Sequence, residues 1–486
     1  RAGCDESMFT LRVPLVALPR SFFVQLPFLR PVSRLLCTRE RCAATFHTSQ
    51  NHRALLKTRV LGELKTMKIN GDQFKSIITP EMRFLEELFT RNGFEIRIAG
   101  GAVRDLLMGQ IPHDIDFAST ATPDEMKKMF TDEGIRMINA GGEKHGTITA
   151  RINDKENFEV TTLRVDVVTD GRRAEVEFTK DWQVDANRRD LTVNSMFLSF
   201  DGTVFDYFKG IEHLQERKIL FVGDATRRIQ EDYLRILRYF RFYGRLAIDE
   251  NGHDGPTLEA IRANVDGLKI ISGERLWVEL RKIIEGPLYC PLVCLMHELG
   301  VTRYLGFPDA PDFDEFRKVC RISDRLQPSA MTRLAALLRS EDEVLNLHAR
   351  LRLSNAERNH LLFIVRNRDS TSKGQMDDDI GYYKELQFNF NIKGATAKDV
   401  WQWTEELLKY KGNEGLLQEF RAWEIPHFPI NGSKLMAVGV RKGPKLGHVL
   451  TRLRQLWFKS NFMLTEAELM DKLSDVLREL SPPRKS

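Results

Sequence analysis

Residues 94–119 read FEIRIAGGAVRDLLMGQIPHDIDFAS, and this stretch decides the fold. Residues 94–99 alternate between apolar and polar side chains, a pattern that predicts a strand. Gly100 and Gly101 end that strand at a junction where a helix is expected to begin. Residues 113–117, HDIDF, predict the next strand. A strand, a glycine turn, a helix and a second strand together indicate a mixed α/β unit.

The mixed character extends to both sides of this stretch. Residues 81–91 have the pattern of a helix, and Thr122, Pro123 and Glu125 form the start signal of another. Strand-like runs follow at residues 146–152, 158–165 and 174–179. Residues 193–208 predict a hairpin that turns at Asp201 and Gly202.

Beyond about residue 218, the period of the apolar residues changes from two to about 3.6. Helices are predicted at residues 226–246, 257–264 and 275–284, and much of the remaining chain has the same period. Residues 369–379 are predicted to form an exposed loop. We therefore predict an α+β protein, in which an N-terminal α/β region is followed by all-helical domains.

Composition excludes several classes of protein. The 486 residues are 42% hydrophobic and 29% charged, which excludes a chain that is disordered throughout. At about 150 residues per domain, the length predicts roughly three domains. No run of about 18 apolar residues is present, so no membrane-spanning segment is predicted. The six cysteines are too scattered for a disulfide framework or a four-ligand zinc site.

The formal net charge of +5 is unevenly distributed. Residues 1–66 carry 11 Lys and Arg against 4 Asp and Glu, which leaves 62 against 64 in residues 67–486. The basic surplus therefore belongs to the first 66 residues. A nucleic-acid partner cannot be argued from the overall charge and requires a local basic patch.

Residues 1–66 have the composition of a mitochondrial transit peptide. Between residues 8 and 39 there are five arginines and no acidic residue, and residues 45–49 are rich in Ser and Thr. The alternative is a disordered leader without a targeting role. A second start at Met67 would give a form without the leader, which is expected in the cytoplasm or nucleus.

Asp114 and Asp116 are candidate ligands of a divalent cation. Residues i and i+2 of a strand point to the same side, and two carboxylates on one side repel each other unless a cation neutralises them. Glu159, on a later predicted strand, is a candidate third carboxylate. The alternatives are a chance Asp-x-Asp and, for Glu159, a solvated strand residue.

Two further motifs have the residue types that bind phosphate. Gly100 and Gly101, at a strand-to-helix junction, let backbone N–H groups approach a phosphate, and Arg104 follows within a turn. The later motif RRDLTVN contains Arg188 and Arg189, which can clamp a triphosphate, and Asp190, which can accept a ribose hydroxyl. The alternatives are a plain tight turn for the first motif and a solvated basic pair for the second.

Asp232 and Arg235 lie one turn apart on the helix predicted at residues 226–246. An Asp acceptor beside an Arg donor matches the base edges of cytosine and adenine and opposes those of guanine and uracil. A mismatch would leave buried polar groups unpaired. The alternative is an ordinary ion pair within a helix. Arg238 and Arg241 continue the same helix.

The ordered set GGAVRD, DID, RRDLTVN, EDYLR and SGER, the last at residues 272–275, resembles a known family. It is that of the class II tRNA nucleotidyltransferases, the CCA-adding enzymes of the DNA polymerase beta superfamily. The resemblance runs from about Met67 to the C-terminus and is strongest to the animal mitochondrial type. Bacterial-type poly(A) polymerases share most of the set.

The resemblance implies an activity and a site. Members of the family add C, C and A to the 3′ end of tRNA from CTP and ATP, without a nucleic-acid template and with two Mg²⁺ ions, for which Mn²⁺ can substitute. It implies metal ligands at Asp114 and Asp116, with Glu159 as a further catalytic residue. The residues implied to bind the nucleotide are Gly100, Gly101, Arg104, Arg188, Arg189, Asp190, Asp232, Arg235, Arg238 and Arg241.

The resemblance also implies four domains after the leader of residues 1–66. They are a nucleotidyltransferase head at residues 67–210, a neck that recognises the base at 211–285, a helical body at 286–410 and a tRNA-binding tail at 411–486. Residues 425–465 contain no Asp or Glu, which supports a surface for RNA phosphates there. The candidate tRNA contacts are Lys434, Arg441, Lys442, Lys445, Arg452 and Arg454. The alternative is a solvated basic helix face.

Two other functions remain open at this point. One is a poly(A) polymerase of the same superfamily, and the other is a tRNA-binding protein without catalytic activity. The acidic residues at 114 and 116 and the pair at 232 and 235 favour an enzyme. The sequence does not indicate an oligomeric state.

Overall fold

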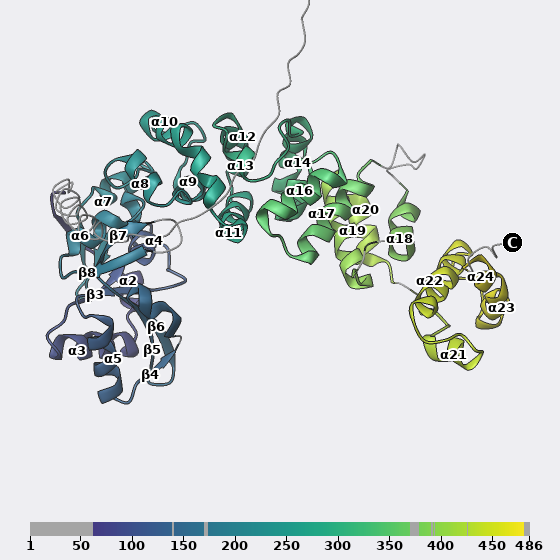
Figure 1. The fold of residues 1–486 in the computed structure, drawn as a ribbon, viewed down its shortest axis with the longest axis horizontal. Coiled ribbons are helices and arrows are strands. Elements are labelled where there is room, and N and C mark those ends of the chain that lie inside the picture. The colour runs from purple at the N-terminus through teal and green to yellow at the C-terminus, as the bar shows by residue number, and fades with distance from the viewer. Residues whose placement is uncertain are drawn as a thin grey trace, which may run out of the picture. The chain divides into compact units, whose positions relative to one another are not determined.

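The computed structural model describes residues 62–138, 140–169, 174–369, 379–389, 392, 394–424 and 426–480. Most of the predicted leader and of the predicted loop at residues 369–379 lies outside these residues. The α/β region followed by helices is confirmed (Figure 1). In the part of the chain that is described, no helix has both the length and the apolar character needed to cross a membrane.

The α/β region is built on a sheet with the strand order β1-β10-β9-β2-β3-β6-β5-β4. In this sheet β3 and β6 are parallel, and the other neighbouring strands are antiparallel. A separate hairpin pairs β7 with β8. The strands are β1 (Lys65–Lys68), β2 (Ile96–Ala99), β3 (Asp116–Ser119), β4 (Arg136–Ile138), β5 (Thr147–Ile152), β6 (Glu156–Thr162), β7 (Arg164–Thr169), β8 (Ala174–Phe178), β9 (Phe197–Leu198) and β10 (Thr203–Asp206).

The sheet is buried on both faces because its residues alternate. Ile98 and Phe117 pack into the large apolar cluster that includes α3 and α5, whereas Ala99 and Ala118 pack into a second cluster with Trp182 of α6. Since β2 and β3 are antiparallel, the end of β2 and the start of β3 lie at the same edge of the sheet. That edge is where the functional motifs meet.

The helices have the following bounds. Up to residue 284 they are α2 (Asp72–Ile77), α3 (Pro80–Arg91), α4 (Gly101–Leu107), α5 (Pro123–Asp132), η1 (Ala140–His145), α6 (Trp182–Arg188), η2 (Thr192–Asn194), α7 (Gly210–Gln215), α8 (Ala225–Glu231), α9 (Arg235–Leu246), α10 (Gly255–Asn264), η3 (Val265–Ile270) and α11 (Gly273–Ile284). Beyond residue 284 they are α12 (Tyr289–Glu298), α13 (Val301–Tyr304), α14 (Phe313–Leu326), α15 (Ala330–Ala335), α16 (Glu341–Leu351), α17 (Asn355–Asn367), α18 (Ile380–Asn389), α19 (Ala397–Lys411), α20 (Glu414–Ala422), α21 (Gly432–Ala437), α22 (Pro444–Lys459), α23 (Glu466–Asp471) and α24 (Leu473–Glu479).

Several predicted elements are confirmed and several are shorter than predicted. The start signal at Thr122 is confirmed, because its hydroxyl accepts from Glu125 N at 3.3 Å and Glu125 Oε2 accepts from Thr122 N at 2.7 Å. The run at 158–165 divides between β6 and β7, and the first strand of the predicted hairpin is reduced to β9 because η2 precedes it. Near the C-terminal end, α22 begins at Pro444 and includes Gly447.

The prediction of one helix over residues 226–246 is wrong. α8 ends at Glu231, and Asp232 has an extended backbone with φ −155° and ψ 105°. The Asp232 carboxylate accepts from the backbone N–H of Leu234 at 3.2 Å, and α9 begins at Arg235. The short side chain of Asp thus competes with the helix for backbone donors, which is why Asp favours helix ends.

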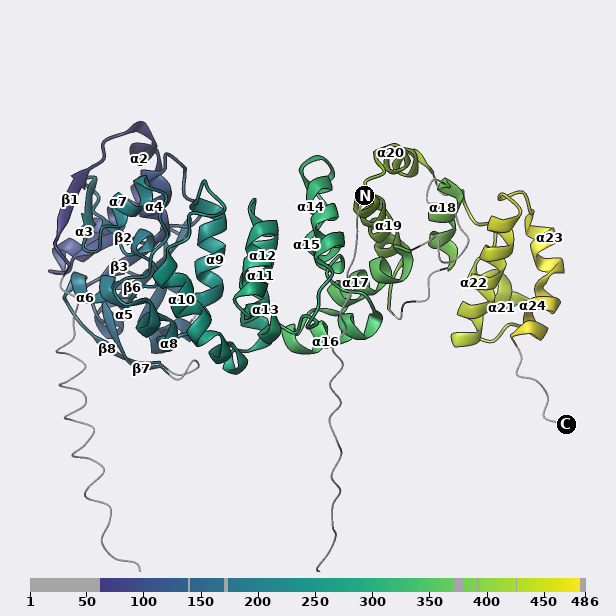
Figure 2. The same cartoon turned by 90° about the horizontal axis from the view of Figure 1, so that it is seen from above.

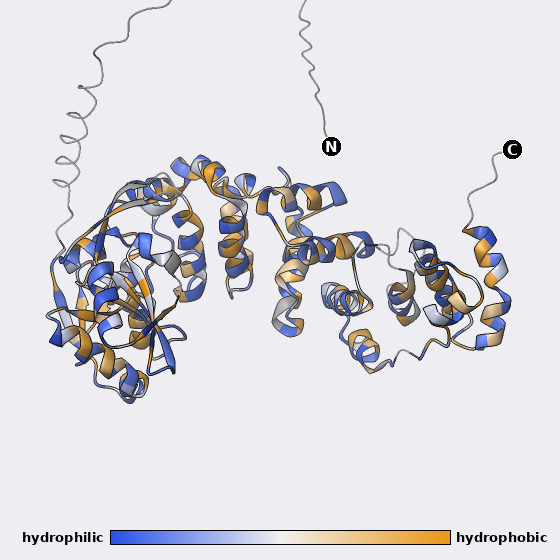
Figure 3. Ribbon diagram, turned by 60° about the horizontal axis from the view of Figure 1, so that its bottom comes forward, coloured by the Kyte–Doolittle hydropathy of each residue, from blue (hydrophilic) through white to orange (hydrophobic). Residues whose placement is uncertain are grey.

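The apolar side chains form separate clusters along the chain. α19 and α20 contribute Leu407, Leu408, Leu417 and Phe420 to the large cluster, whereas α21 to α24 have a cluster of their own around Trp457. Figure 2 views these helices from above, and Figure 3 shows hydrophobic residues along one side of many of them. The last four helices therefore have their own core.

Candidate active site

The residues predicted to bind metal or nucleotide all line one cavity. Its volume is about 740 Å³, and its walls come from the sheet edge, from α4, from the segment around α6 and from α9 and α11. The predicted residues that line it are Gly100, Gly101, Arg104, Asp114, Asp116, Glu159, Arg188, Arg189, Asp190, Asp232, Arg235, Arg238 and Arg241. The fold therefore brings motifs that are far apart in the sequence into one cavity.

Three carboxylates meet at the sheet edge. Asp116 is the first residue of β3 and is in register with Glu159 on the parallel neighbour β6. Asp114 lies before the strand, which corrects the prediction that Asp114 and Asp116 share a strand. Strand pairing starts only at Asp116, so the chain before it leaves the sheet. The Asp114 side chain is 85% exposed and lies 3.0 Å from Nδ1 of His113.

The charges at this edge are not balanced by the protein. The Asp116 and Glu159 side chains are solvent-accessible, yet the pKa of Asp116 is raised, first by partial desolvation within the cavity and then by the negative charges of Glu159 and Asp114, while Arg189 opposes the shift. Within the described part of the chain, the side chains of Asp116 and Glu159 make no hydrogen bond or ion pair. Carboxylates that crowd one another in this way fit an oxygen-binding dication.

The structure does not form a closed metal cage. Within the described ranges, no group of three or more His, Cys, Asp or Glu side chains has the arrangement of a complete metal site. Mg²⁺ is usually held by one or two carboxylates, with substrate phosphates and water as its other ligands. Asp114 and Asp116 fit such an open site.

Gly100 allows the phosphate-binding motifs to approach one another. Its φ is +66°, and a Cβ there would lie 2.8 Å from Nη1 of Arg189. Arg104, on α4, is buried and donates to Oδ1 of Asp105 at 2.8–2.9 Å and to Oδ1 of Asn194 at 2.5 Å. Arg104 lines the cavity, but its donors are engaged by the protein.

The two adjacent arginines project from the end of α6 and the residue after it. Both are bound by the buried carboxylate of Asp185, which accepts from Nε of Arg188 at 2.8 Å and from Nη2 of Arg189 at 3.1 Å. Asp190, the next residue, accepts from Nε of Arg238 at 2.6 Å. Burial alone would raise the pKa of Asp190, but the positive charge of Arg238 holds it below its usual value.

Asp232 and Arg235 both line the cavity, but each binds another partner. Asp232 Oδ2 accepts from Nη2 of Arg275 at 2.7 Å. Arg235 donates to Oε2 of Glu231 at 2.6 Å and to the carbonyl of Arg188 at 2.9 Å. The two side chains thus stay separate, with an acceptor and a donor facing the same cavity.

Arg241 and Phe242 complete the wall formed by α9. Both guanidinium contacts of Arg241 at 2.9 and 3.0 Å go to the carboxylate of Glu279. The guanidinium carbons of Arg241, Arg104 and Arg238 lie 4.3, 5.1 and 5.6 Å from the centre of the Phe242 ring. One aromatic ring therefore supports three arginines.

The chain is 51% identical over 408 residues to the mouse (Mus musculus) protein CCA tRNA nucleotidyltransferase 1, mitochondrial, covering 84% of this chain and 93% of the mouse protein. The zebrafish (Danio rerio) protein of the same name is 52% identical over 412 residues, covering 85% of this chain and 94% of the zebrafish protein. The chain belongs to the CCA tRNA nucleotidyltransferase family.

Two family models match parts of this CCA tRNA nucleotidyltransferase family member. The model of the poly A polymerase head domain matches residues 96–220, and that of the probable RNA and SrmB-binding site of polymerase A matches residues 254–314. The CCA-adding enzyme of Bacillus stearothermophilus in complex with CTP has a TM-score of 0.62 and 23% identity, covering 82% of this chain and 98% of that one. At that identity the likeness concerns the fold.

The sequence did not predict the side chains that hold the cavity residues in place. They are Asp185, Asn194, Glu231, Phe242, Arg245 and Glu279. Two of them follow from helical spacing, because Asp185 precedes Arg188 by three positions and Glu231 precedes Arg235 by four. Phe242 lies on α9 itself, four positions after Arg238, whereas Asn194, Arg245 and Glu279 bind partners in distant segments that no local pattern indicates.

The predicted tRNA contacts of this family member lie in the last cluster of helices. Arg441, Lys442 and Lys445 are exposed, and their side chains bind no other described residue. Lys434 pairs with Glu466 at 2.7 Å, and Arg452 with Glu479 at 2.9 Å. The segment 441–445 therefore offers the most available positive charge.

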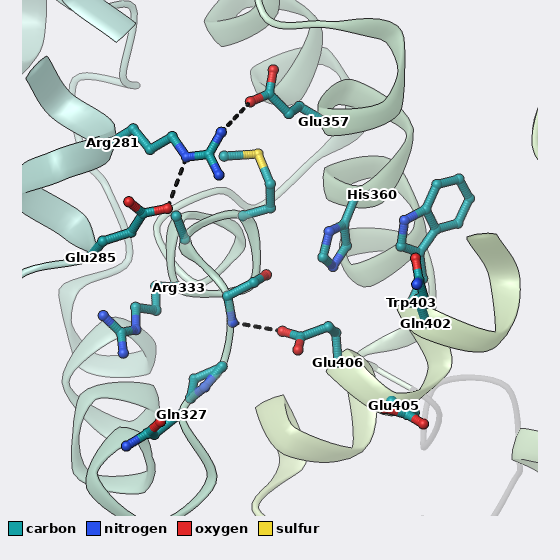
Figure 4. A pocket seen from close by; sticks show the side chains of 14 residues that line it. Arg281, Glu285, Gln327, Arg333, Glu357, His360, Gln402, Trp403, Glu405 and Glu406 are labelled. Atoms are coloured by element: carbon teal, nitrogen blue, oxygen red, sulfur yellow. Dashed lines mark hydrogen bonds and ion pairs between the residues drawn. The ribbon is translucent and has the colours of Figure 1, made fainter. Parts of the chain in front are cut away.

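A second cavity, of about 630 Å³, lies between α11, α15, α17 and α19 and contains none of the predicted residues (Figure 4). Most of its charged groups are bonded within the protein, although Nε of Arg333 has no hydrogen-bond partner among the described residues. Arg281 binds Glu285 at 2.8 Å, and Glu406 accepts from the backbone N–H of Ser329 at 2.7 Å. The indole of Trp277 donates to Glu357 at 3.0 Å. Within the described residues, each carboxylate that lines this cavity is bonded to a protein donor, unlike Asp116 and Glu159 in the first cavity.

Proposed function

We propose that this protein adds C, C and A to the 3′ end of tRNA from CTP and ATP without a nucleic-acid template. The observation that carries the proposal is that one cavity contains the acidic residues and also the separate acceptor and donor of Asp232 and Arg235. The names of its relatives support it. So do likenesses to CCA-adding enzymes in complex with CTP, with ATP and, in Thermotoga maritima, with a tRNA.

We propose that Asp114 and Asp116 hold Mg²⁺, or Mn²⁺ in its place, with Glu159 as a third catalytic carboxylate. Two such ions, when bound, supply the Lewis acidity that lowers the pKa of the tRNA 3′-hydroxyl and neutralises the departing pyrophosphate. The protein's own part is to place the hydroxyl and the α-phosphate in line. No protein nucleophile is required.

The remaining cavity residues bind the nucleotide in this proposal. Arg188 and Arg189 neutralise the triphosphate from one wall, beside the glycine turn at Gly100 and Gly101. Asp232 accepts from the exocyclic amino group of cytosine or adenine, and Arg235 donates to the ring nitrogen beside it. Guanine and uracil present the reverse pattern, so Asp232 would face an acceptor and Arg235 would face a donor.

Arg104, Asp190, Arg238 and Arg241 belong to the same nucleotide-binding wall. Because their charged groups are already bonded within the protein, they give this wall a fixed shape. A fixed shape is needed for selectivity, since a flexible donor and acceptor could adapt to the wrong base.

We also propose the division into a head at 67–210, a neck at 211–285, a body at 286–410 and a tail at 411–486. α20 packs with the body, so the independent core of the tail begins after it, near Ile430. The tail would hold tRNA phosphates through Lys434, Arg441, Lys442, Lys445, Arg452 and Arg454. This places RNA binding away from the catalytic carboxylates in the sequence.

The protein is proposed to act in the mitochondrion, as the names of its relatives indicate. A second form that starts at Met67 would act in the cytoplasm or nucleus. Met67 lies within β1, opposite Val204 of β10. Such a form would lack the first half of this edge strand, which leaves the cavity residues in place.

The test is incorporation into a tRNA that lacks its last three nucleotides, with each NTP alone and with all four. We expect C, C and A to be added and extension to stop there. Long tails of A would favour the poly(A) polymerase, whose head domain this chain matches. Absence of incorporation at saturating Mg²⁺, with tRNA binding intact, would favour a binding protein without catalytic activity.

A further inference from the structure

Asp185 is a buried carboxylate that does not line the cavity. Its side chain is 1% exposed, whereas its neighbours Arg188 and Arg189 both line the cavity wall. A buried charge is costly unless it is paired and hydrogen-bonded. The partners of Asp185 therefore explain why it is there.

Asp185 binds three residues that belong to that wall. Oδ1 accepts from Nε of Arg188 at 2.8 Å and from the backbone N–H of Arg164 at 3.2 Å. Oδ2 accepts from Nη2 and Nε of Arg189 at 3.1 and 3.3 Å. Arg164 is the first residue of β7, so one carboxylate ties both arginines to the start of the β7–β8 hairpin.

The two arginines also have contacts that fix them from the other side. Nη1 of Arg189 donates to the carbonyl of Asn194 at 3.3 Å, and its guanidinium lies 4.8 Å from the Phe197 ring centre. The carbonyl of Arg188 accepts from Nη2 of Arg235 at 2.9 Å. Without Asp185, two adjacent guanidinium groups would repel each other across one wall.

We propose that Asp185 is a positioning residue for triphosphate binding, holding Arg188 and Arg189 at the spacing and orientation that the phosphates of the incoming nucleotide require. This inference rests on the proposed function, in which those arginines contact the triphosphate. Asp185 itself touches no substrate. Because CTP and ATP share the triphosphate, the loss of Asp185 weakens the binding of both nucleotides by the same factor.

A merely structural role makes a different prediction. If Asp185 served stability alone, its loss would lower the unfolding temperature and leave the affinity of the folded protein for phosphate unchanged. Inorganic tripolyphosphate separates the two cases, since it competes for the triphosphate site without offering a base. Cytidine is the complementary probe, because it offers a base without phosphate.

The experiment measures inhibition constants for tripolyphosphate and for cytidine, and KM for CTP and ATP, in wild type and in Asp185→Asn. Asn has the size of Asp but neither its charge nor its second acceptor oxygen. We expect the inhibition constant for tripolyphosphate and both KM values to rise at least about tenfold, a loss typical of a misplaced charged contact. The constant for cytidine is expected to change less than about twofold.

Asp206→Asn is the matched control. Asp206 is equally buried and accepts from the backbone N–H groups of Phe208, Gly210 and Ile211 at 2.9–3.0 Å. It makes no contact with the arginines, so its substitution should lower the unfolding temperature and leave tripolyphosphate inhibition unchanged. Should Asp185→Asn fail to fold, Asp185→Glu retains the charge and displaces it by one methylene, and the same rise is expected.

Arg189→Ala distinguishes failure of this inference from failure of the proposed function. If Arg189→Ala leaves tripolyphosphate inhibition unchanged, the proposed triphosphate contact is wrong, and the inference falls with it. If Arg189→Ala weakens inhibition but a folded Asp185 variant does not, the positioning role alone is overturned. If tripolyphosphate inhibition is weakened equally in Arg189→Ala and in the Asp185 variant, the inference is supported.

Discussion

Most charged residues of the cavity form ion pairs within the protein. Asp116 is an exception, and it lies where the metal ion is proposed to bind. Arg238 binds Asp190, Arg241 binds Glu279, and Asp232 binds Arg275. Asp116 makes no such bond within the described residues, and its pKa is raised by partial desolvation and by the negative charges of Glu159 and Asp114. The part of the cavity where Asp116 and Glu159 form no ion pair with a described residue is therefore where a metal ion is expected.

Substitution of Gly100 tests whether nucleotide binding requires the close approach of Arg189 to the glycine turn. A Cβ at this position would displace Arg189 and would also sit on a backbone with positive φ. We expect Gly100→Ala to lose about 1–2 kcal/mol of stability from the backbone. We also expect the KM for CTP and ATP to rise at least about tenfold because the arginine moves.

Gly93→Ala is the control for that prediction. Gly93 has φ +78°, and a Cβ there meets nothing within 4 Å. It should show the backbone cost, measured by thermal unfolding, with unchanged KM values. Equal KM values in Gly100→Ala and wild type would contradict the proposed role of the turn.

For single residues, the sequence predicted many of the side chains that line the cavity, but it did not predict the side chains to which they are bonded. The motifs contain all the predicted residues, because their chemistry depends on residue type and local spacing. The bonds between motifs join residues far apart in the chain: 90 positions for Arg104 and Asn194, 48 for Arg238 and Asp190, and 43 for Arg275 and Asp232. No periodicity in a single sequence encodes such pairs.

At the scale of elements, the break between α8 and α9 is the main difference from the predicted fold. The apolar period continues through residues 226–246, which is why one helix was predicted. Asp232 accepts a backbone hydrogen bond where a helix would need that donor, so the chain turns before α9. The break moves Asp232 off the helix and toward Arg275, and so separates the acceptor from Arg235.

The packing of His253 against α9 is expected to make the free energy of unfolding depend on pH. His253 stacks on Tyr243 at 3.7 Å between ring centres, and its Nδ1 lies 2.8 Å from Oη of Tyr239. Burial lowers the pKa of His253 to about 4. Since the pKa is lower in the folded state, stability is full above the unfolded value and falls as the pH decreases toward 4.

We expect His253→Gln to reduce this pH dependence. Between about pH 7 and about pH 5, the titration of His253 should cost wild type roughly 2 kcal/mol that the variant does not lose. Urea unfolding at both pH values measures it. His448→Gln, on an exposed residue of α22, is the control and should behave as wild type. A wild-type pH dependence in His253→Gln would contradict the assignment.

At the scale of the whole molecule, nucleotide binding and the proposed tRNA contacts rest on different apolar clusters. The cavity residues belong to elements up to α11, whereas Arg441, Lys442 and Lys445 belong to the tail with its own core. Changes on one should therefore leave the other intact. The α+β architecture was predicted from periodicity, because both cores depend on regular apolar spacing.

Replacing Arg441, Lys442 and Lys445 together by Ala tests this separation. We expect the Kd for tRNA to rise at least about tenfold, and the salt dependence of binding to weaken, because fewer counterions are released. The KM for CTP should stay unchanged. Ala at Lys75, Lys128 and Arg136, exposed basic residues of the α/β region, removes the same charge and should have little effect. Equal tRNA affinity in the two triple variants would contradict the assignment.

The central claim is that one cavity both performs the transfer and selects the nucleotide. Its most direct test is incorporation of each NTP into a tRNA lacking its 3′ CCA by wild type, Asp116→Asn, Asp232→Ala and Arg235→Ala. We predict that wild type adds only C and A, that Asp116→Asn adds nothing while still binding tRNA, and that Asp232→Ala and Arg235→Ala show relaxed or lost selectivity. Unchanged preference for C and A in both of these last variants would contradict the claim.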